Sequence, residues 1–203
     1  MKNKTILIIF FTLVSLLAIS NYSLWIDEST TAYFASQTSI ADLNTELLDA
    51  RTSEVQMPGY IYFMWGWEKL FGHNEFILRL SNLPFLVILL IVIAFAPLTD
   101  RMKIILGLFI SFSPFIWSNL NEARSTIPLF SFGGILLLSL IYYFFGESSL
   151  QRKGVWIFSF TLIAGVSFNM LFLLYIPVLF FLFLYHAIHC KSKFKTLLKD
   201  WWL

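Results

Sequence analysis

The chain has 203 residues, of which 58% are hydrophobic and only 13% are charged, with a net charge of +2. A soluble domain of this length needs more charge to cover its surface, so the composition excludes that class and predicts an all-α polytopic membrane protein. The single cysteine, Cys190, excludes a disulfide framework and a cysteine-based zinc site.

Six apolar segments follow one another, and each approaches the roughly 20 residues that a membrane span needs. The first four are residues 5–20 (extending toward 25), 81–98, 104–117 (interrupted by Pro114) and 126–145. The stretch 155–188 is about twice one span, so we expect it to fold back near 167–170, at Asn169. The first segment also has the features of a cleaved signal peptide, although the many later spans favour a retained helix.

The distribution of charge predicts the orientation of these spans. If the N-terminus is inside and the segments alternate, ten of the fourteen basic residues lie inside and nine of the twelve acidic residues lie outside. Lys and Arg favour the inner side of short loops, so we expect this orientation. Residues 1–203 then form one transmembrane module: a first span (1–25), a long outer loop (26–80), the remaining spans (81–190) and a basic inner tail (191–203).

The outer loop contains three short predicted helices. Residues 27–37 begin with two acids, and residues 40–48 place their apolar side chains on one face. Residues 58–71 follow Met57 and are rich in tyrosine and tryptophan, which favour the headgroup level of a membrane. This third helix is therefore expected to lie along the outer interface.

Charged residues that could carry chemistry gather at the predicted outer face. Carboxylates there could accept a proton from a hydroxyl nucleophile, and arginines could bind phosphate oxygens in a fork. The candidates are Asp27, Glu28, Glu54, Arg79, Glu122 and Arg124.

Each candidate also has a simpler interpretation. The two adjacent acids Asp27 and Glu28 could begin a helix, where the dipole favours negative charge. Glu54 could be a solvated loop acid, and Arg79 could extend along the membrane surface from the second span. Glu122 and Arg124 could form a surface pair of little energetic weight.

The order of the motifs resembles the GT-C class of membrane glycosyltransferases, specifically the protein O-mannosyltransferase and aminoarabinose transferase superfamily, which includes Rgt-type bacterial members. Residues 25–35, "WIDESTTAYFA", resemble the family's W-x-DE-x-x-x-A pattern. Residues 54–84, beginning "EVQMPGYIYF" and including "WEKLFG", resemble the family's acid, proline-aromatic and W-x-x-L-F-G motifs. Residues 113–129, "SPFIWSNLNEARSTIPL", resemble its S-P and E-A-R segment, and "GVSFNMLFLLYIP" loosely matches a later motif.

The chain departs from this pattern at three positions. Met57 stands for the first residue of the family's double proline, and Thr126 stands where a tyrosine is usual. A histidine near the fifth-to-sixth turn is replaced by Phe168 or Asn169. Members of this family have more spans, so the resemblance implies that this chain corresponds to the N-terminal half of such an enzyme, a GT-C-like N-terminal module.

The resemblance implies an inverting sugar transfer at the outer face. The donor would be a sugar linked to a polyprenyl phosphate, and the acceptor a hydroxyl on a lipid, glycan or protein. Asp27 would be the catalytic base, with Glu28 as a weaker second carboxylate, and Arg124 would be preferred over Arg79 for the leaving phosphate. The remaining expected substrate-binding residues are Glu54, Tyr60 and Glu122. The resemblance leaves open a divalent cation held by Asp27 and Glu54.

Two other functional classes remain open from the sequence. A transporter or flippase subunit would place ionisable groups in the middle of its spans, and these spans are nearly free of charge. A non-catalytic membrane scaffold, or a decayed fragment of an enzyme, is the other. No basic cluster interleaved with aromatic residues lies outside the membrane face, so nucleic acid is not an expected partner. The expected location is a bacterial inner or plasma membrane.

Overall fold

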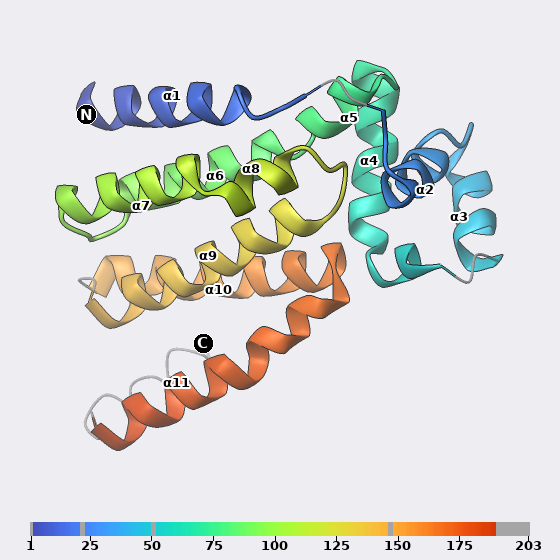
Figure 1. Cartoon of the computed structure of the whole chain (residues 1–203). Helices are drawn as coiled ribbons and strands as arrows, with labels where there is room; N and C mark the ends of the chain where they lie inside the picture. Colours follow the sequence, from blue (N-terminus) through green and yellow to red (C-terminus); the bar gives the residue numbers. More distant parts are fainter. Residues whose placement is uncertain (1, 21–22, 50–51, 146–147, 190–203) are drawn as a thin grey trace.

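The computed structural model describes residues 2–20, 23–49, 52–145 and 148–189, and this part of the chain is all-helical (Figure 1). The predicted all-α class is therefore confirmed for these residues. The helices are α1 (Lys2–Leu16), α2 (Ile26–Ala35), α3 (Ile40–Asp49), η1 (Ser53–Gln56), α4 (Pro58–Phe71), α5 (Glu75–Leu80), α6 (Leu83–Phe95), α7 (Asp100–Phe112), α8 (Pro114–Leu120), α9 (Thr126–Phe145), α10 (Ser148–Phe168), η2 (Met170–Leu174) and α11 (Tyr175–His189).

The long helices form a bundle that is closed at one end by the short ones. Figure 1 shows α1, α6, α7, α9 and α10 running alongside one another, with α4 crossing them at one end and α2 and α3 beyond it. The largest apolar core lies between α1, α6 and α9 and includes Phe11, Leu86, Leu90 and Ile135. We call the end that carries α2 to α5 the capped end.

Helix starts and stops follow from local sequence. Proline occupies the first turns of α4, α6 and α8, where its missing N–H costs no hydrogen bond. The side chains of Asn74 and Thr99 cap α5 and α7 by accepting hydrogen bonds from backbone N–H groups. Gly72, at φ 100°, ends α4 in a conformation that side chains with a Cβ rarely adopt. Asn169 separates α10 from η2, which is where the sequence predicts the chain to fold back.

Within the described ranges, two or three helical segments are long and apolar enough to cross a membrane. Glu75–Phe95, which contains α5 and α6, and Thr126–Tyr143 pass this test, and α7 with α8 pass together if their 52° bend lies within one span. The apolar helices Lys4–Leu16, Lys153–Phe168 and Met170–Leu182 are shorter. A membrane protein is thus supported, while six spans remain a prediction. The first helix ends at Leu16, four residues before the predicted end of the first span.

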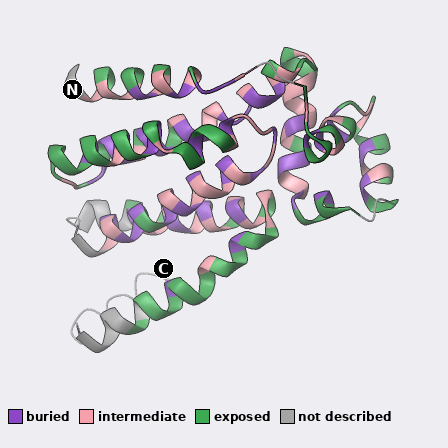
Figure 2. Ribbon diagram, viewed as in Figure 1, coloured by how far each residue is buried: buried purple, intermediate pink, exposed green. Residues whose placement is uncertain are grey.

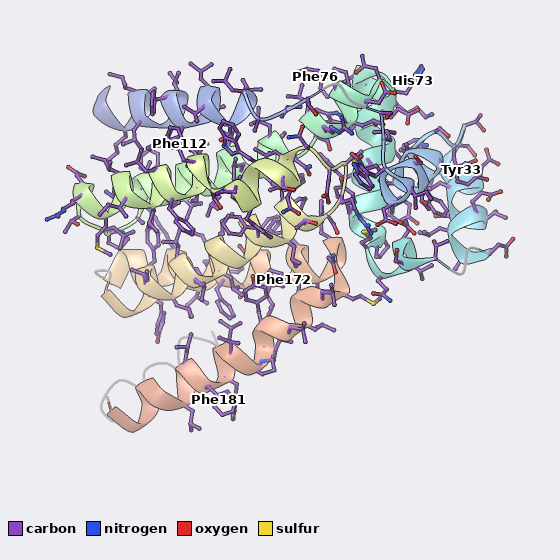
Figure 3. All side chains as sticks on the ribbon, in the orientation of Figure 1. Tyr33, His73, Phe76, Phe112, Phe172 and Phe181 are labelled. Carbon is purple, nitrogen blue, oxygen red and sulfur yellow. The ribbon has the colours of Figure 1, made fainter. Side chains whose placement is uncertain are left out.

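The sides of the bundle expose large apolar side chains. Figure 2 shows exposed residues along α7 and α11, and Figure 3 places Phe112 and Phe181 on these two helices. The exposed fractions of Phe112 and Phe181 are 54% and 67%. Exposed apolar surface of this extent is unusual for a soluble monomer and suits contact with lipid.

The three helices predicted in the outer loop are present as α2, α3 and α4. Leu43 and Leu47 of α3 are buried against Phe34 of α2 and Ile61 of α4, so the apolar face read from the sequence makes a small core of its own. Figure 1 shows α4 lying across the bundle axis, as expected of a helix at an interface.

The fold makes a testable prediction about topology. The start of α1, the α6–α7 turn and the start of α10 lie at the end opposite the capped end (Figure 1), so the two ends carry the residues that the charge pattern places on opposite sides of the membrane. In a Cys190→Ser background, a cysteine at Asn44 should react with an impermeant reagent added outside, and one at Ser149 should not. The reverse labelling pattern would contradict the predicted orientation.

Candidate functional site

Glu28 and Arg79 form a buried ion pair at the capped end. The Nη2 atom of Arg79 lies 3.0 Å from Oε2 of Glu28, and Nε donates to Oε1 at 3.1 Å. The two side chains are only 2% and 1% exposed. Arg79 also donates to the carbonyl oxygens of Ser20 and Ser23 at 3.2 and 3.3 Å. The pair therefore fastens the segment before α2 to the start of the α5–α6 span.

Backbone N–H groups complete the environment of the Glu28 carboxylate. Trp25, at the start of α2, donates to Oε2 at 2.9 Å, and Ala123, in the loop before α9, donates to Oε1 at 2.8 Å. Burial by itself would raise the pKa of Glu28, but the hydrogen bonds from Arg79, Trp25 and Ala123 outweigh it and lower the pKa below the ordinary value of 4.5. An ionised carboxylate whose oxygens are engaged in this way positions three segments of chain and is poorly suited to accept a proton.

Asp27 and Arg124 form a second ion pair, which is open to water. A guanidinium N–H of Arg124 donates to Oδ2 of Asp27. The side chain of Asp27 is 63% exposed and that of Arg124 is 24% exposed. The structure thus joins the predicted base directly to the preferred phosphate ligand, and it separates Asp27 from Glu28 because successive helix residues point in different directions.

Glu54 and Glu122 occupy different environments. Glu54, in η1, is 2% exposed and accepts a hydrogen bond from the Ser53 hydroxyl at 3.3 Å, so the interpretation as a solvated loop acid is wrong. Its burial follows from the packing of η1 against α3 and α4. Glu122 is half-buried, and its backbone carbonyl accepts a hydrogen bond from the Asn82 side chain at 2.6 Å. The structure therefore brings neither carboxylate into the Asp27–Arg124 pair.

Tyr60, also predicted to bind substrate, is fully buried at the start of α4. Burial raises the pKa of its phenol well above the ordinary value of 10.0. The hydroxyl lies close to Ser81 but has no hydrogen-bond partner in the described part of the chain, and the Ser81 hydroxyl donates to the Leu78 carbonyl. In this conformation Tyr60 is part of the apolar core of the capped end and does not face water.

Two amide side chains, those of Asn121 and Asn169, link separate loops at the capped end. The Asn121 amide accepts from the Ser20 N–H at 2.6 Å and also donates to the Ala18 carbonyl, which ties the end of the first span to the loop after α8. Asn169 donates to the Ser125 hydroxyl at 2.8 Å, linking the α10–η2 turn to the loop before α9. The only signal for Asn121 in the sequence is a polar residue after an apolar segment, whereas Asn169 is the residue at which the sequence predicts the fold-back.

An aromatic cluster joins α4 to the end of α10. The ring of Phe168 lies 5.3 to 6.4 Å from the rings of four neighbours, namely Tyr60, Phe63, Phe85 and Phe132. Gly59 permits this approach, because a Cβ there would lie 2.6 Å from the carbonyl oxygen of Ser167. The position where the resembled family has a histidine is therefore filled here by a packing residue or by the hydrogen-bonding Asn169.

The carboxylates of the site do not assemble a metal centre. Among the described residues, no group of three or more His, Cys, Asp or Glu side chains converges. Asp27 is engaged by a guanidinium, which repels a cation, and Glu54 is buried beside Ser53. Because one of these carboxylates is held by a guanidinium and the other is buried, the two do not fit the divalent cation that the resemblance left open.

Among its described residues, the capped end thus carries two ion pairs, one buried between Glu28 and Arg79 and one exposed between Asp27 and Arg124. The exposed pair is the only one of the two that a ligand could reach without unfolding the cap. No known protein family, curated protein or solved structure matches the chain.

Proposed function

We infer that the chain is a membrane glycosyltransferase, or the N-terminal part of one, which moves a sugar from a polyprenyl phosphate to a hydroxyl acceptor at the outer face. The observation that supports this proposal best is the exposed pair of Asp27 and Arg124. It sets a group that can accept a proton beside a group that can bind phosphate, at the end of an apolar bundle. That combination suits a ligand with a lipid tail and an anionic head.

The proposed reaction is a single inverting displacement. The acceptor hydroxyl oxygen attacks the anomeric carbon and forms the new glycosidic bond, while the bond from that carbon to the phosphate oxygen breaks. The hydroxyl proton passes to the Asp27 carboxylate, and the polyprenyl phosphate departs with the electron pair of the broken bond. The leaving group is a stable anion, so it needs a positive charge such as that of Arg124 rather than a proton.

The neighbouring residues take positioning roles in this proposal. Glu28 and Arg79 hold the start of α2, and therefore Asp27, against the loop that carries Arg124. The resemblance connects three further residues with the substrate: Glu54, Tyr60 and Glu122. In the described part of the chain, none of them forms a hydrogen bond with Asp27 or Arg124. Because Glu54 and Tyr60 are buried, we assign them to the packing of the cap, and only the half-buried Glu122 is proposed to contact the acceptor.

The burial pattern disfavours a transporter. In the described part of α9 and α10 and in the last turns of α1 and α7, the buried polar side chains away from the starts of helices are hydroxyls, namely Ser15, Ser111, Ser131, Ser139 and Thr161. The buried Lys103 stands in the first turn of α7, next to Asp100. A transport path would place ionisable groups at mid-span.

The proposal is tested by a transfer assay. Membranes containing this chain, alone and together with any neighbouring downstream reading frame, are supplied with radiolabelled polyprenyl-phosphate sugars. Transfer of label to an endogenous acceptor supports the proposal. Absence of transfer in both arrangements, from a stably inserted protein, would favour the non-catalytic scaffold or decayed fragment.

Asp27 and a bound phosphate would compete for Arg124, which gives a separate prediction for the binding of polyprenyl phosphate. If Arg124 binds the phosphate, Asp27→Asn should tighten binding of polyprenyl phosphate up to about fivefold, because an exposed pair of this kind is worth about 1 kcal/mol at most. Arg124→Gln should weaken the same binding by about tenfold or more, since a charged hydrogen bond is lost. Binding is measured with radiolabelled polyprenyl phosphate on protein held in lipid nanodiscs.

The sign of the Asp27→Asn effect decides this prediction. Weaker binding in Asp27→Asn would mean that Asp27 helps to hold the lipid and does not compete for Arg124. An Asp49→Asn variant, which removes an exposed acid from α3, is the matched control for the change in net charge.

A further inference from the structure

A cleft at the capped end lies on the side of α2 that the exposed ion pair does not use. It has a volume of about 470 Å³, within the roughly 300–1,000 Å³ of small-molecule sites. One wall is a single face of α2, with Ser29, Ala32, Tyr33 and Ser36 at helical spacing. Figure 3 shows Tyr33 and His73 at the end of the molecule where α2 to α5 lie.

The opposite wall comes from the end of α4 and the turn after it. Glu68 lies in the last turn of α4, His73 follows Gly72, and the buried Leu78 of α5 completes the cleft. The conformation of Gly72, at φ 100°, sets the direction of the chain that carries His73. A carboxylate in the last turn of a helix is disfavoured by the helix dipole, so Glu68 is placed where it costs stability. Residues that contradict local structural preferences in this way are often found at functional sites.

Apart from the His73 imidazole, which has both a donor and an acceptor nitrogen when neutral, the polar side chains that line the cleft offer lone pairs. The hydroxyls of Ser29 and Ser36 donate to the carbonyl oxygens of Trp25 and Tyr33, so their oxygens face a ligand as acceptors. The Glu68 carboxylate is an acceptor as well. The Tyr33 hydroxyl donates to Glu46, outside the cleft, and leaves its ring as a wall. The cleft therefore fits a ligand that supplies several hydrogen-bond donors.

The charge and shape of the cleft decide which ligand with several hydrogen-bond donors fits it. Glu68 lines the cleft and Glu46 accepts a hydrogen bond from the Tyr33 hydroxyl, while the ammonium group of Lys69 lies 3.4 Å from the carbonyl oxygen of Ser36, so both signs of charge border the cleft. A ligand that carries no charge avoids repulsion by either sign, which favours a neutral polyol over a polyamine. The Tyr33 ring and Ala32 offer apolar surface of the kind that packs against the C–H face of a sugar ring.

We propose that this cleft is a binding site for a neutral saccharide. The site goes beyond the transfer reaction proposed above, because it needs neither a lipid-linked donor nor a proton acceptor. Its ligand binds by donating hydroxyl hydrogens to Glu68 and the two serines, with one ring face against Tyr33 and Ala32.

The test is saturation-transfer NMR on the full chain in lipid nanodiscs, without any donor lipid. The probes are the methyl glycosides of glucose, galactose, mannose and arabinose, with spermidine as a competitor. We expect transfer to at least one glycoside. Ser29→Trp, which fills the cleft from an exposed helix position, should abolish this signal. Glu68→Gln should weaken the affinity by about tenfold through loss of one charged hydrogen bond.

Two variants serve as matched controls. Thr45→Trp adds the same ring at an exposed helix position of α3 whose hydroxyl makes the same kind of bond, to a carbonyl four residues earlier. Asp49→Asn removes an exposed acid outside the cleft. Both should bind as the unmodified chain does. Glu68→Gln removes the unfavourable charge at the end of the helix, so this variant should fold normally. It therefore still tests the proposal if the Ser29→Trp variant does not fold.

Three results would overturn the proposal. These are no signal from any glycoside with the unmodified chain, an unchanged signal in folded Ser29→Trp and Glu68→Gln, or displacement of the glycoside by spermidine at equal concentration. None of them depends on whether the chain transfers sugar, so failure of this site and failure of the proposed reaction are separate outcomes.

Discussion

Replacing Arg79 with methionine should cost about 3–5 kcal/mol in unfolding free energy, because it leaves the Glu28 carboxylate buried without its charged partner. Both side chains are almost inaccessible to water, and the guanidinium also holds two carbonyl oxygens before α2. The measurement is thermal or denaturant unfolding in detergent micelles. Asp27→Asn, which breaks the exposed pair, is the control and should cost less than about 1 kcal/mol.

The same pair predicts a response to acid. The pKa of Glu28 is lowered in the folded state below its ordinary value of 4.5, so its ionised form stabilises the fold above that pH. This contribution should disappear as the pH falls below 4.5 and through the lowered pKa of the folded state. Glu28→Gln should be less stable at neutral pH and should lack this part of the acid dependence. An Arg79→Met variant as stable as the unmodified chain would show that the buried pair does not hold the cap together.

Asp27→Asn should reduce sugar transfer by about 10²–10⁴-fold, which is the usual contribution of a positioned general base. The asparagine can still accept a hydrogen bond from Arg124, but it cannot take the hydroxyl proton. Because Asp27 is exposed, the amount of protein in the membrane and its unfolding should not change. The measurement is the initial rate of label transfer at equal protein levels. It uses the chain alone or together with the downstream reading frame, whichever condition supports transfer.

The adjacent acid provides the contrast for this experiment. Glu28→Gln should lower stability first and activity only in proportion to the protein that remains folded. Asp27→Glu, which keeps the carboxylate but moves it, should retain part of the rate. Full transfer by Asp27→Asn would remove Asp27 from the mechanism and leave the exposed pair as a surface contact.

The sequence predicts the local elements of the cap well. Two acids at a helix start, a proline after Met57 and a polar Asn169 inside an apolar stretch each act on a few neighbouring residues, and α2, α4 and the α10–η2 break lie where these signals place them. Apolar content alone predicts helix ends less well, since α1 ends at Leu16 while the apolar run continues.

The partners of the charged residues could not be predicted from the sequence. Glu28 bonds Arg79 across 51 residues and Ala123 across 95, and such contacts depend on how the helices pack. The sequence shows that Asp27 and Glu28 must point in different directions, because neighbours on a helix do. It does not show which of them faces the interior, and it equally fails to show that Glu54 is covered by α3 and α4.

The close fit of Gly59 against Ser167 has a consequence for the order in which the protein is made. The two residues are about 100 positions apart, so at roughly 5–20 residues per second α4 leaves the ribosome several seconds before its docking partner exists. During that interval its tyrosine and tryptophan side chains can rest at the lipid surface, which suits their affinity for the headgroup level. Translation that stops before Ser167 would therefore leave α4 without its contact to α10, and this part of the packing would wait until α10 is synthesised.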